Sequence, residues 1–225
     1  GAGIPTKYIP MWKEADIKVV PVAASVAAAK MMARAGADAV IAEGGESGGH
    51  IGEMSTMPLV PQVADAVDIP VLAAGGIGDG RGLAAAFMLG AVGVQMGTRF
   101  LLAEECGVHQ NYKDMVLKAT DISTTATGRR FGGSTCRVLK NQFTRNFLKL
   151  EYEPKTTAEM IDQLGAGAAA EQGMEQGRNR YVRCGDGLDA VSAGGWHRAE
   201  KRGKLDSLPA ELGYCPGTSG GVNPY

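Results

Sequence analysis

A single histidine lies inside a glycine-rich segment that directly follows an apolar run. The run is Ala39-Val40-Ile41-Ala42, and the chain continues as Glu43-Gly44-Gly45-Glu46-Ser47-Gly48-Gly49-His50-Ile51-Gly52. Glycines cost conformational entropy on folding, so a dense group of them indicates a strained turn or a close approach of backbone to a ligand. An imidazole titrates near neutral pH and can give or take a proton. We therefore predict that His50 transfers protons beside a bound cofactor, the alternative being a helix cap or a satisfied loop residue. Glu46 is expected to face solvent.

Two further glycine turns follow apolar runs later in the chain. Ala73-Ala74 leads into Gly75-Gly76, and Val94-Gln95-Met96 leads into Gly97-Thr98. Bare amides at a helix N-terminus attract anions, and in (β/α)8 barrels phosphate sites favour the loops after the last two strands. We interpret the two turns as a phosphate cradle, the alternative being ordinary turns. Glu43, which ends an earlier run, is either a ligand-binding carboxylate or the polar end of a strand.

The elements that must position these residues are four strand-like runs, each followed by a helix-like segment. The runs are continuously apolar, as expected of parallel strands covered on both faces. Ser25, Thr56 and Asp79 are expected to cap the helices that follow the first three runs. On the third of these helices, Leu83 and Phe87 are expected to face inward. The four runs are residues 18–23, 37–42, 69–74 and 92–96.

Strand–helix alternation at this spacing predicts right-handed βαβ units, either in a (β/α)8 barrel or in a doubly wound sheet. Four units form half of a barrel, and a whole barrel usually needs about 250 residues. We expect residues 1–100 to be the C-terminal half of a TIM barrel, and residues 101–169 to be a helical, polar extension. Residues 170–225 are rich in glycine and arginine and weakly periodic. They are expected to be a disordered tail, from a shifted reading frame or an unrelated sequence.

The composition of the chain argues against several classes of partner. Lysine plus arginine (23) nearly balance aspartate plus glutamate (24), so no basic surface for nucleic acid is expected. No apolar stretch reaches the ~18–20 residues of a membrane span, and no signal peptide opens the chain. The four cysteines are far apart, which predicts no metal site, no disulfide framework and a cytoplasmic location.

Two other motifs suggest chemistry that we reject. Gly80-Arg81-Gly82-Leu83-Ala84-Ala85 fits the dinucleotide fingerprint, but it lies inside a helix start and not at a strand-end turn, and no acidic residue at a strand end follows at the required distance. Cys106-Gly107-Val108-His109 combines a thiol with an imidazole, but nothing nearby would orient the base. We interpret the first as an ordinary helix start and the second as a surface loop.

Several linked segments together resemble one enzyme family. They are Gly48-Gly49-His50-Ile51-Gly52, Ser55-Thr56-Met57, Leu59-Val60-Pro61-Gln62-Val63, Ala73-Ala74-Gly75-Gly76-Ile77 and Gly97-Thr98-Arg99-Phe100. This combination is similar to the flavin-dependent enoyl-acyl-carrier-protein reductases (enoyl reductase II), close relatives of the nitronate monooxygenases. The resemblance begins at residue 1 and extends to about residue 169. His-Ile-Gly followed by Ser-Thr-Met favours the reductase branch.

The resemblance implies an FMN-containing barrel that uses NADH or NADPH to reduce the double bond of a trans-2-enoyl thioester. It implies acyl-carrier protein as the partner that carries the substrate, and a homodimer for the full-length family. It matches Gly75-Gly76 and Gly97-Thr98 to the turns that bind the FMN phosphate, and places Glu43 and Gly48-Gly49 near the flavin and nicotinamide. Hydride transfer leaves an enolate that needs a donor and a proton. His50 is the catalytic candidate for that role, or else it positions the nicotinamide.

Two departures from the family leave other functions open. The family's first strands have no counterpart upstream of Gly1, and the likeness stops after Gly165-Ala166-Gly167-Ala168. One alternative is a nitronate monooxygenase, which would keep FMN and oxidise alkyl nitronates. The other is a non-catalytic barrel fragment, whose open strand edges would favour self-association.

Overall fold

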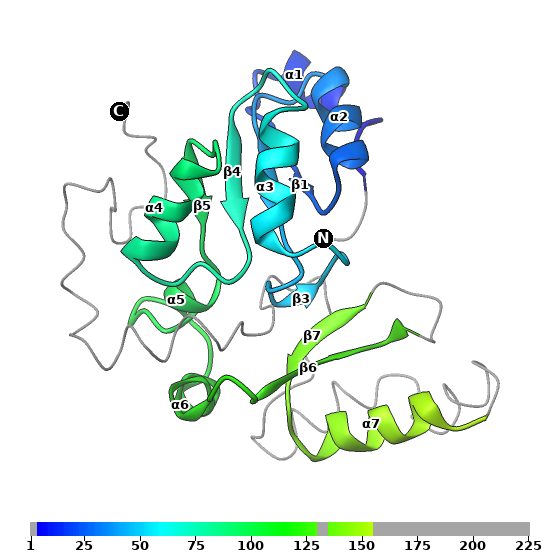
Figure 1. The fold of residues 1–225 in the computed structure, drawn as a ribbon, viewed down its shortest axis with the longest axis vertical. Helices are drawn as coiled ribbons and strands as arrows, with labels where there is room; N and C mark the ends of the chain where they lie inside the picture. Colours follow the sequence, from blue (N-terminus) through cyan, green and yellow to red (C-terminus); the bar gives the residue numbers. More distant parts are fainter. Residues whose placement is uncertain (1–3, 130–134, 155–225) are drawn as a thin grey trace.

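Four short parallel strands form a sheet in the first part of the chain. The computed structural model describes residues 4–129 and 135–154, and Figure 1 shows this sheet in the upper half of the molecule. The strand order is β1-β2-β4-β5, and each neighbouring pair is parallel. All four strands overlap the runs expected from the sequence. They are β1 (Val22–Ala23), β2 (Val40–Glu43), β4 (Val71–Ala74) and β5 (Gly93–Gln95).

Helices alternate with these strands, which confirms the α/β class. The helix α1 (Ile9–Glu14) precedes the sheet, and α2 (Val26–Arg34) follows β1. The helix α3 (Thr56–Ala64) joins β2 to β4, and α4 (Gly80–Met88) joins β4 to β5. The one-turn helix α5 (Thr98–Leu101) follows β5. Two parallel strands need a crossover connection between them, so the helices between the strands explain why the strands can run parallel.

Polar side chains begin two of these helices, as expected. The Ser25 hydroxyl accepts a hydrogen bond from Ala28 N at 3.2 Å at the start of α2. The Asp79 carboxylate accepts bonds from Arg81 N at 3.0 Å and Gly82 N at 3.3 Å at the start of α4. Each bond satisfies an amide that the helix itself leaves without a partner, so both caps are confirmed.

The core of this region lies between the sheet and the helices α2 and α3. The strands contribute small and β-branched residues, which let the helices pack closely on the sheet. A fully buried large aliphatic side chain contributes ~1.5–3 kcal/mol relative to exposure, so this packing holds the strand ends in place. The buried residues include Met32, Val40, Ala42, Leu59, Val60, Val63, Val71 and Ala73.

The expected orientation of Phe87 on α4 is wrong. Its side chain is 46% exposed, whereas Ala86 is buried and Leu83 is half-buried. The helix α4 packs on β5, an edge strand that pairs only with β4 within the described ranges. Beyond β5 the described sheet offers no further strand for a large ring, so α4 buries a small residue instead.

An antiparallel sheet of three strands contains His50 and lies in the lower half of Figure 1. Its order is β3-β7-β6, and two helices flank the β6–β7 hairpin in the chain. Within the described residues, the expectation that residues 101–169 form a helical extension is correct for α6 and α7 and wrong for the hairpin, where β-branched threonines favour a strand. The elements are β3 (Gly49–His50), α6 (Gln110–Lys118), β6 (Thr124–Thr127), β7 (Cys136–Leu139) and α7 (Gln142–Tyr152).

Two expectations about the rest of the chain lie outside the described residues. These are the part of the helical extension beyond residue 154 and the tail at 170–225. Within the described ranges, every helix is too short or too polar to cross a membrane.

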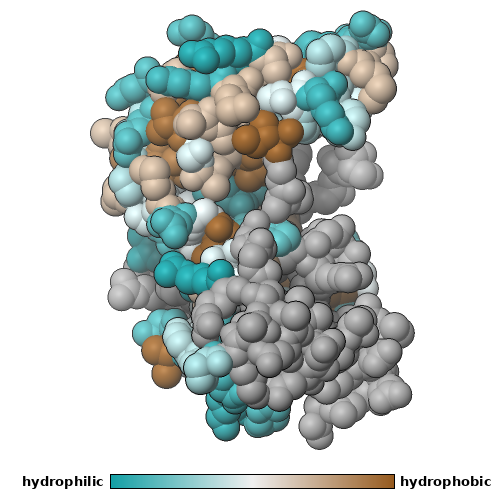
Figure 2. Space-filling view, turned by 90° about the vertical axis from the view of Figure 1, so that its right-hand side faces the viewer, coloured by the Kyte–Doolittle hydropathy of each residue, from teal (hydrophilic) through white to brown (hydrophobic). Residues whose placement is uncertain are grey.

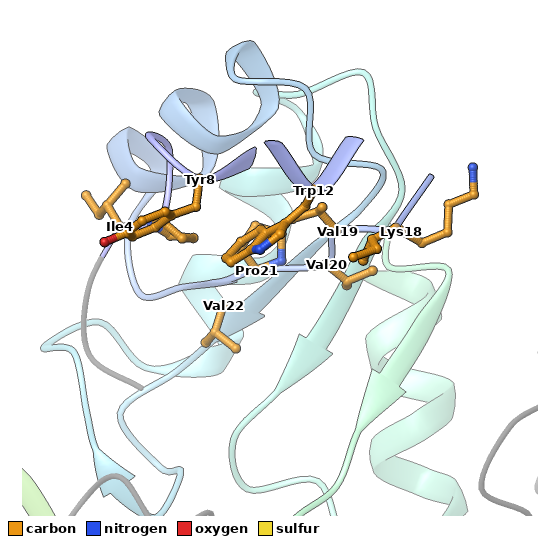
Figure 3. Close-up of a pocket in the computed structure, with 10 residues that line it drawn as sticks. Ile4, Tyr8, Trp12, Lys18, Val19, Val20, Pro21 and Val22 are labelled. Carbon is orange, nitrogen blue, oxygen red and sulfur yellow. The ribbon is translucent and has the colours of Figure 1, made fainter. Parts of the chain in front are cut away.

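An apolar groove of about 690 Å³ runs beside the outer edge of β1. Its lining includes Tyr8, Trp12, Pro21 and Val22, which Figure 3 labels. The two aromatic rings stack with their centroids 5.8 Å apart. Figure 2 shows apolar residues gathered on this upper half of the surface. None of the expected site residues lines the groove. They lie instead at or after the carboxyl ends of the strands.

Candidate functional site

Three strand ends meet at the carboxyl edge of the parallel sheet. Glu43 of β2 pairs with Ala74 of β4, and Ala74 pairs with Gln95 of β5. Neighbouring strands lie about 4.8 Å apart, so the segments that follow them begin side by side. These segments are residues 44–52, which we call the glycine loop, and the two turns Gly75-Gly76 and Gly97-Thr98. The register therefore places the start of the glycine loop and the turns Gly75-Gly76 and Gly97-Thr98 at one edge of the sheet.

The glycine loop packs directly on the turn after β4. Gly44 N donates to Ala74 O at 3.0 Å, and Gly75 has a φ of +98°. A Cβ on Gly44 would lie 2.2 Å from Thr56 Oγ1, and a Cβ on Gly75 would lie 2.8 Å from Gly44 O. Both glycines are therefore required by the packing of protein against protein, and Gly75 also by its left-handed backbone.

Glu46 caps α3 in place of the Thr56 side chain. Its carboxylate oxygens accept hydrogen bonds from Thr56 N at 3.0 and 2.8 Å and from Thr56 Oγ1 at 2.9 Å. Thr56 Oγ1 also lies 2.8 Å from Gly75 O, and Ser55 holds the N-cap position without a side-chain bond. The expectations that Glu46 faces solvent and that Thr56 caps the helix are wrong. A carboxylate satisfies a free amide and complements the helix dipole, so the loop's own acid replaces the local cap.

The turn after β5 is open, unlike the turn after β4. A Cβ on Gly97 would meet no atom of residues 4–129 or 135–154 within 4 Å. Arg99, two residues further on, is 7% exposed, and its Nε and Nη1 have no hydrogen-bond partner among the residues that the structure describes. Buried donors are normally satisfied, and a buried guanidinium without an acceptor is costly. The Arg99 guanidinium is therefore a candidate to bind an anionic group.

His50 lies in the antiparallel sheet, beside a thiol. It pairs with Cys136 of β7, which in turn pairs with Thr127 of β6. Because Ile51 N donates to Thr135 O at 2.9 Å, His50 and Cys136 form the non-hydrogen-bonded kind of pair, whose side chains approach closely on one face. The imidazole is half-buried and Cys136 is buried. The sequence did not indicate this neighbour.

Arg137 extends from the other face of the same sheet to the glycine loop. Its Nε and Nη2 donate to Gly45 O at 3.1 and 2.9 Å, and its Nη1 donates to Thr124 Oγ1 at 3.4 Å. The hairpin is thereby connected to the loop that follows β2.

The remaining expected residues lie on the border of the same region. Glu43 is the last residue of β2 and is half-buried. Gly48 is half-buried near the end of the glycine loop, and Gly49, with a φ of +74°, opens β3. A positive φ is a conformation that glycine adopts freely, so Gly49 has a backbone reason to be glycine.

The two rejected motifs have structural roles. The amides of Arg81 and Gly82 bond to the Asp79 carboxylate and are not open to a phosphate. The Arg81 guanidinium bonds to the same carboxylate and, with these amides, holds the pKa of Asp79 below its usual range. His109 Nδ1 accepts a hydrogen bond from Asn111 N at 3.2 Å and begins α6.

Sequence reasoning missed three residues that hold the site. Glu46 lies ten positions before the amide that it caps, outside the range of local capping patterns. Arg137 contacts a carbonyl 92 positions away, so no local signal marks it. Arg99 does have a signal, since it is a lone charge directly after a glycine turn and next to apolar residues.

The groups at the carboxyl edge fit a phosphate-bearing cofactor such as the FMN that the sequence resemblance implies. Gly97 leaves open space for an anion, and Arg99 offers buried charged donors without acceptors. Ser47 Oγ in the glycine loop is also buried and without a partner in the described part of the chain. The same residue ranges contain no group of three or more His, Cys, Asp or Glu side chains that could hold a metal ion.

Known proteins resemble this chain in sequence. The model of the nitronate monooxygenase family matches residues 1–187. The (3aS,4S,5R,7aS)-5-hydroxy-7a-methyl-1-oxo-octahydro-1H-indene-4-carboxyl-CoA dehydrogenase of Rhodococcus jostii (strain RHA1) is 48% identical over 134 residues, which are 60% of this chain and 38% of that protein. A probable nitronate monooxygenase of Staphylococcus aureus (strain MSSA476) is 40% identical over 160 residues, or 66% of this chain and 45% of that protein. The chain thus spans less than half the length of these curated relatives.

Solved structures show the same likeness. FabK from Thermotoga maritima has a TM-score of 0.74 and 46% identity, over 87% of this chain and 60% of that chain. A nitroalkane oxidase from Streptomyces ansochromogenes has a TM-score of 0.61 and 32% identity, over 86% of this chain and 55% of that one. With the family model covering most of its length, this chain belongs to the nitronate monooxygenase family of flavin-dependent oxidoreductases.

Proposed function

We propose that the chain carries the C-terminal half of an FMN-binding (β/α)8 barrel, and that the protein is an enoyl-acyl-carrier-protein reductase using NADH or NADPH. The observation that carries this proposal is the carboxyl edge of the parallel sheet. There the turn at Gly97 leaves open space, and the nearby residue Arg99 has buried donors without an acceptor in the described structure. The strand before this turn ends level with the strand before the loop that leads to His50. Ligands of open parallel sheets and barrels bind at this edge.

The relatives support an acyl thioester as the substrate. FabK is an enoyl-acyl-carrier-protein reductase and shares 46% identity with the chain, against 32% for the nitroalkane oxidase. The dehydrogenase of Rhodococcus jostii acts on a carboxyl-CoA, which is also an acyl thioester. The partner that presents the thioester would be acyl-carrier protein.

The residues of the strand-end turns would hold the cofactor. Gly97-Thr98 and Arg99 would receive the phosphate of FMN, with Gly75-Gly76 on the neighbouring strand. Glu43 and Gly48-Gly49 would line the flavin and the nicotinamide. When bound, FMN supplies the hydride-transfer chemistry that the side chains of this chain lack. A phosphate on buried cationic donors would also relieve the desolvation of Arg99.

His50 would supply the proton of the reaction. Reduction of a trans-2-enoyl thioester adds a hydride equivalent at the β-carbon and a proton at the α-carbon. The half-buried imidazole is a side chain that can act as a general acid, and the adjacent thiol of Cys136 gives it an uncommon neighbour.

Oxidation of alkyl nitronates is the second candidate. The probable nitronate monooxygenase of Staphylococcus aureus and the nitroalkane oxidase of Streptomyces ansochromogenes favour it by name. Both reactions would use the same flavin site, so the substrate decides between them.

The test is purification of the protein followed by two assays. We expect a yellow protein that oxidises NADH or NADPH when a crotonyl thioester is added. Oxygen uptake on a nitronate without that activity would favour the second candidate. Colourless protein that FMN does not rescue would contradict both and favour a non-catalytic fragment. His50→Ala should abolish turnover and keep the flavin, whereas His109→Ala, which changes the N-cap residue before α6, should keep both.

A further inference from the structure

The strand β7 holds the glycine loop at two points. Arg137 Nε and Nη2 donate to one acceptor, Gly45 O, at 3.1 and 2.9 Å. Near the end of the loop, β3 pairs with β7, and Ile51 N donates to Thr135 O at 2.9 Å. The segment between these points contains His50. A single strand from the hairpin therefore fixes both ends of the segment that carries the candidate catalytic residue.

The first end of this segment needs a restraint from outside. Glycines are the least restrained residues, and the loop contains five of them, so it can adopt many conformations unless partners select one. Within the loop region, Gly45 N donates to Met54 O at 2.8 Å, and a Cβ on Gly45 would lie 2.9 Å from Gly52 O. These contacts, together with the bond from Ser47 N to Gly44 O at 3.1 Å, fold the loop back on itself, and Arg137 adds side-chain donors from another sheet to the Gly45 carbonyl.

The arginine side chain suits this purpose. A guanidinium is planar and permanently charged, and two of its N–H groups on one carbonyl fix both distance and direction. The third contact, from Nη1 to Thr124 Oγ1 at 3.4 Å, ties the same group to β6. Lysine could supply the charge but not the two parallel donors.

We propose that Arg137 is a positioning residue that sets the conformation of the glycine loop and thereby the place of the His50 imidazole. It acts through the Gly45 carbonyl and through β7 itself, because the register puts the His50 side chain on the opposite face of the sheet. Its catalytic consequence rests on the proposed function, whereas its effect on the loop does not.

Amide hydrogen exchange of the full-length chain tests the effect on the loop. Arg137→Ala should speed exchange of the amides in residues 44–52 by about tenfold or more, because the loop opens locally without global unfolding. Arg145→Ala is the matched control: Arg145 is exposed on α7 and bonds to Gln142 Oε1 at 3.0 Å. It should leave exchange in the loop unchanged. Unchanged exchange in Arg137→Ala would overturn the proposal.

Kinetics then separate a positioning role from a merely structural one. Arg137→Ala should lower kcat by about tenfold to a hundredfold, since small displacements of a reacting group are that costly. Its affinity for FMN should stay close to that of the original chain. Added guanidinium, at concentrations far below those that unfold the protein, should restore part of kcat, and Arg137→Lys should remain impaired. A loss of kcat only in proportion to unfolded protein, without rescue, would overturn the positioning role. If the unaltered chain shows no flavin chemistry, the proposed function fails, and hydrogen exchange still tests whether Arg137 sets the conformation of the glycine loop.

Discussion

The two glycine turns at the carboxyl edge of the parallel sheet differ in what surrounds them. At the first, Gly75 and the neighbouring Gly44 of the glycine loop are enclosed: a Cβ on Gly75 would clash with Gly44 O and Thr56 Oγ1, and a Cβ on Gly44 would clash with Thr56. At the second, a Cβ on Gly97 would meet none of the described residues within 4 Å, and Arg99, two residues further along the chain, has buried donors without an acceptor in the described structure. Glycine in the first turn serves the fold. Glycine in the second leaves room for a ligand.

This difference shows that glycine density alone does not locate a cofactor. Both turns follow parallel strands, and both were expected to cradle a phosphate. Only the second combines free space with an unsatisfied cation, which is the combination that an anion needs. Substitutions at the two turns should therefore differ in kind: the first should damage folding, and the second should damage binding.

The largest effect is expected for Gly44→Ala. The new methyl would lie 2.2 Å from Thr56 Oγ1 and 2.3 Å from Thr56 N, and the helix start cannot move away cheaply. We expect a loss of about 3 kcal/mol or more in the free energy of unfolding. Urea denaturation measures it. Gly107→Ala is the control, because a Cβ there meets no atom within 4 Å, and it should change stability little.

Arg99→Met should affect binding and not folding. Charge-assisted hydrogen bonds contribute about 1.5–3 kcal/mol, so FMN should bind roughly tenfold to a hundredfold more weakly. Riboflavin, which lacks the phosphate, should bind as before. The unliganded protein should be no less stable, because a buried charge without a partner has been removed. Flavin fluorescence titration gives both affinities. Equal weakening of FMN and riboflavin would contradict a phosphate contact.

Gly97→Ala should change stability and affinity in opposite directions. Gly97 has φ −92° and ψ −70°, a conformation open to alanine. The unliganded protein should therefore gain about 0.4–1 kcal/mol from the reduced entropy of the unfolded chain. The added methyl would occupy the space in which we propose that the FMN phosphate binds, and FMN affinity should fall by about tenfold. A variant that loses stability would show that the turn is packed like the first one.

Asp79→Ala is expected to have the smallest effect and no effect on flavin binding. Removal of the α4 cap should cost about 1 kcal/mol at neutral pH. The Arg81 guanidinium and the backbone amides lower the pKa of Asp79 from 3.8, so its stabilising contribution is present above that value. It disappears as the pH falls through the lower folded-state pKa. Unfolding curves of the variant and the original chain should therefore converge in strong acid, and a constant difference would contradict this role.

The sequence predicted those parts of the molecule whose causes are local. Continuous apolar runs predicted β1, β2, β4 and β5, and short-range capping predicted Ser25 and Asp79. It did not predict the strand β3, which has two residues and exists because β7 pairs with it. The contact of Arg137 with Gly45 is equally non-local. The catalytic role of His50 and the cofactor-binding roles of Glu43 and the glycine turns remain predictions.

The register between β2, β4 and β5 has a consequence for length changes in the chain. Each residue inserted into β4 would move Gly75 by about 3.3 Å along the strand and turn its neighbours to the opposite face. An insertion between α3 and β4, at the amino edge, would leave all three strand ends aligned. We therefore expect the protein to tolerate insertions in the loops that lead from helices into strands. Insertions where the strands lead into the glycine turns should hardly be tolerated.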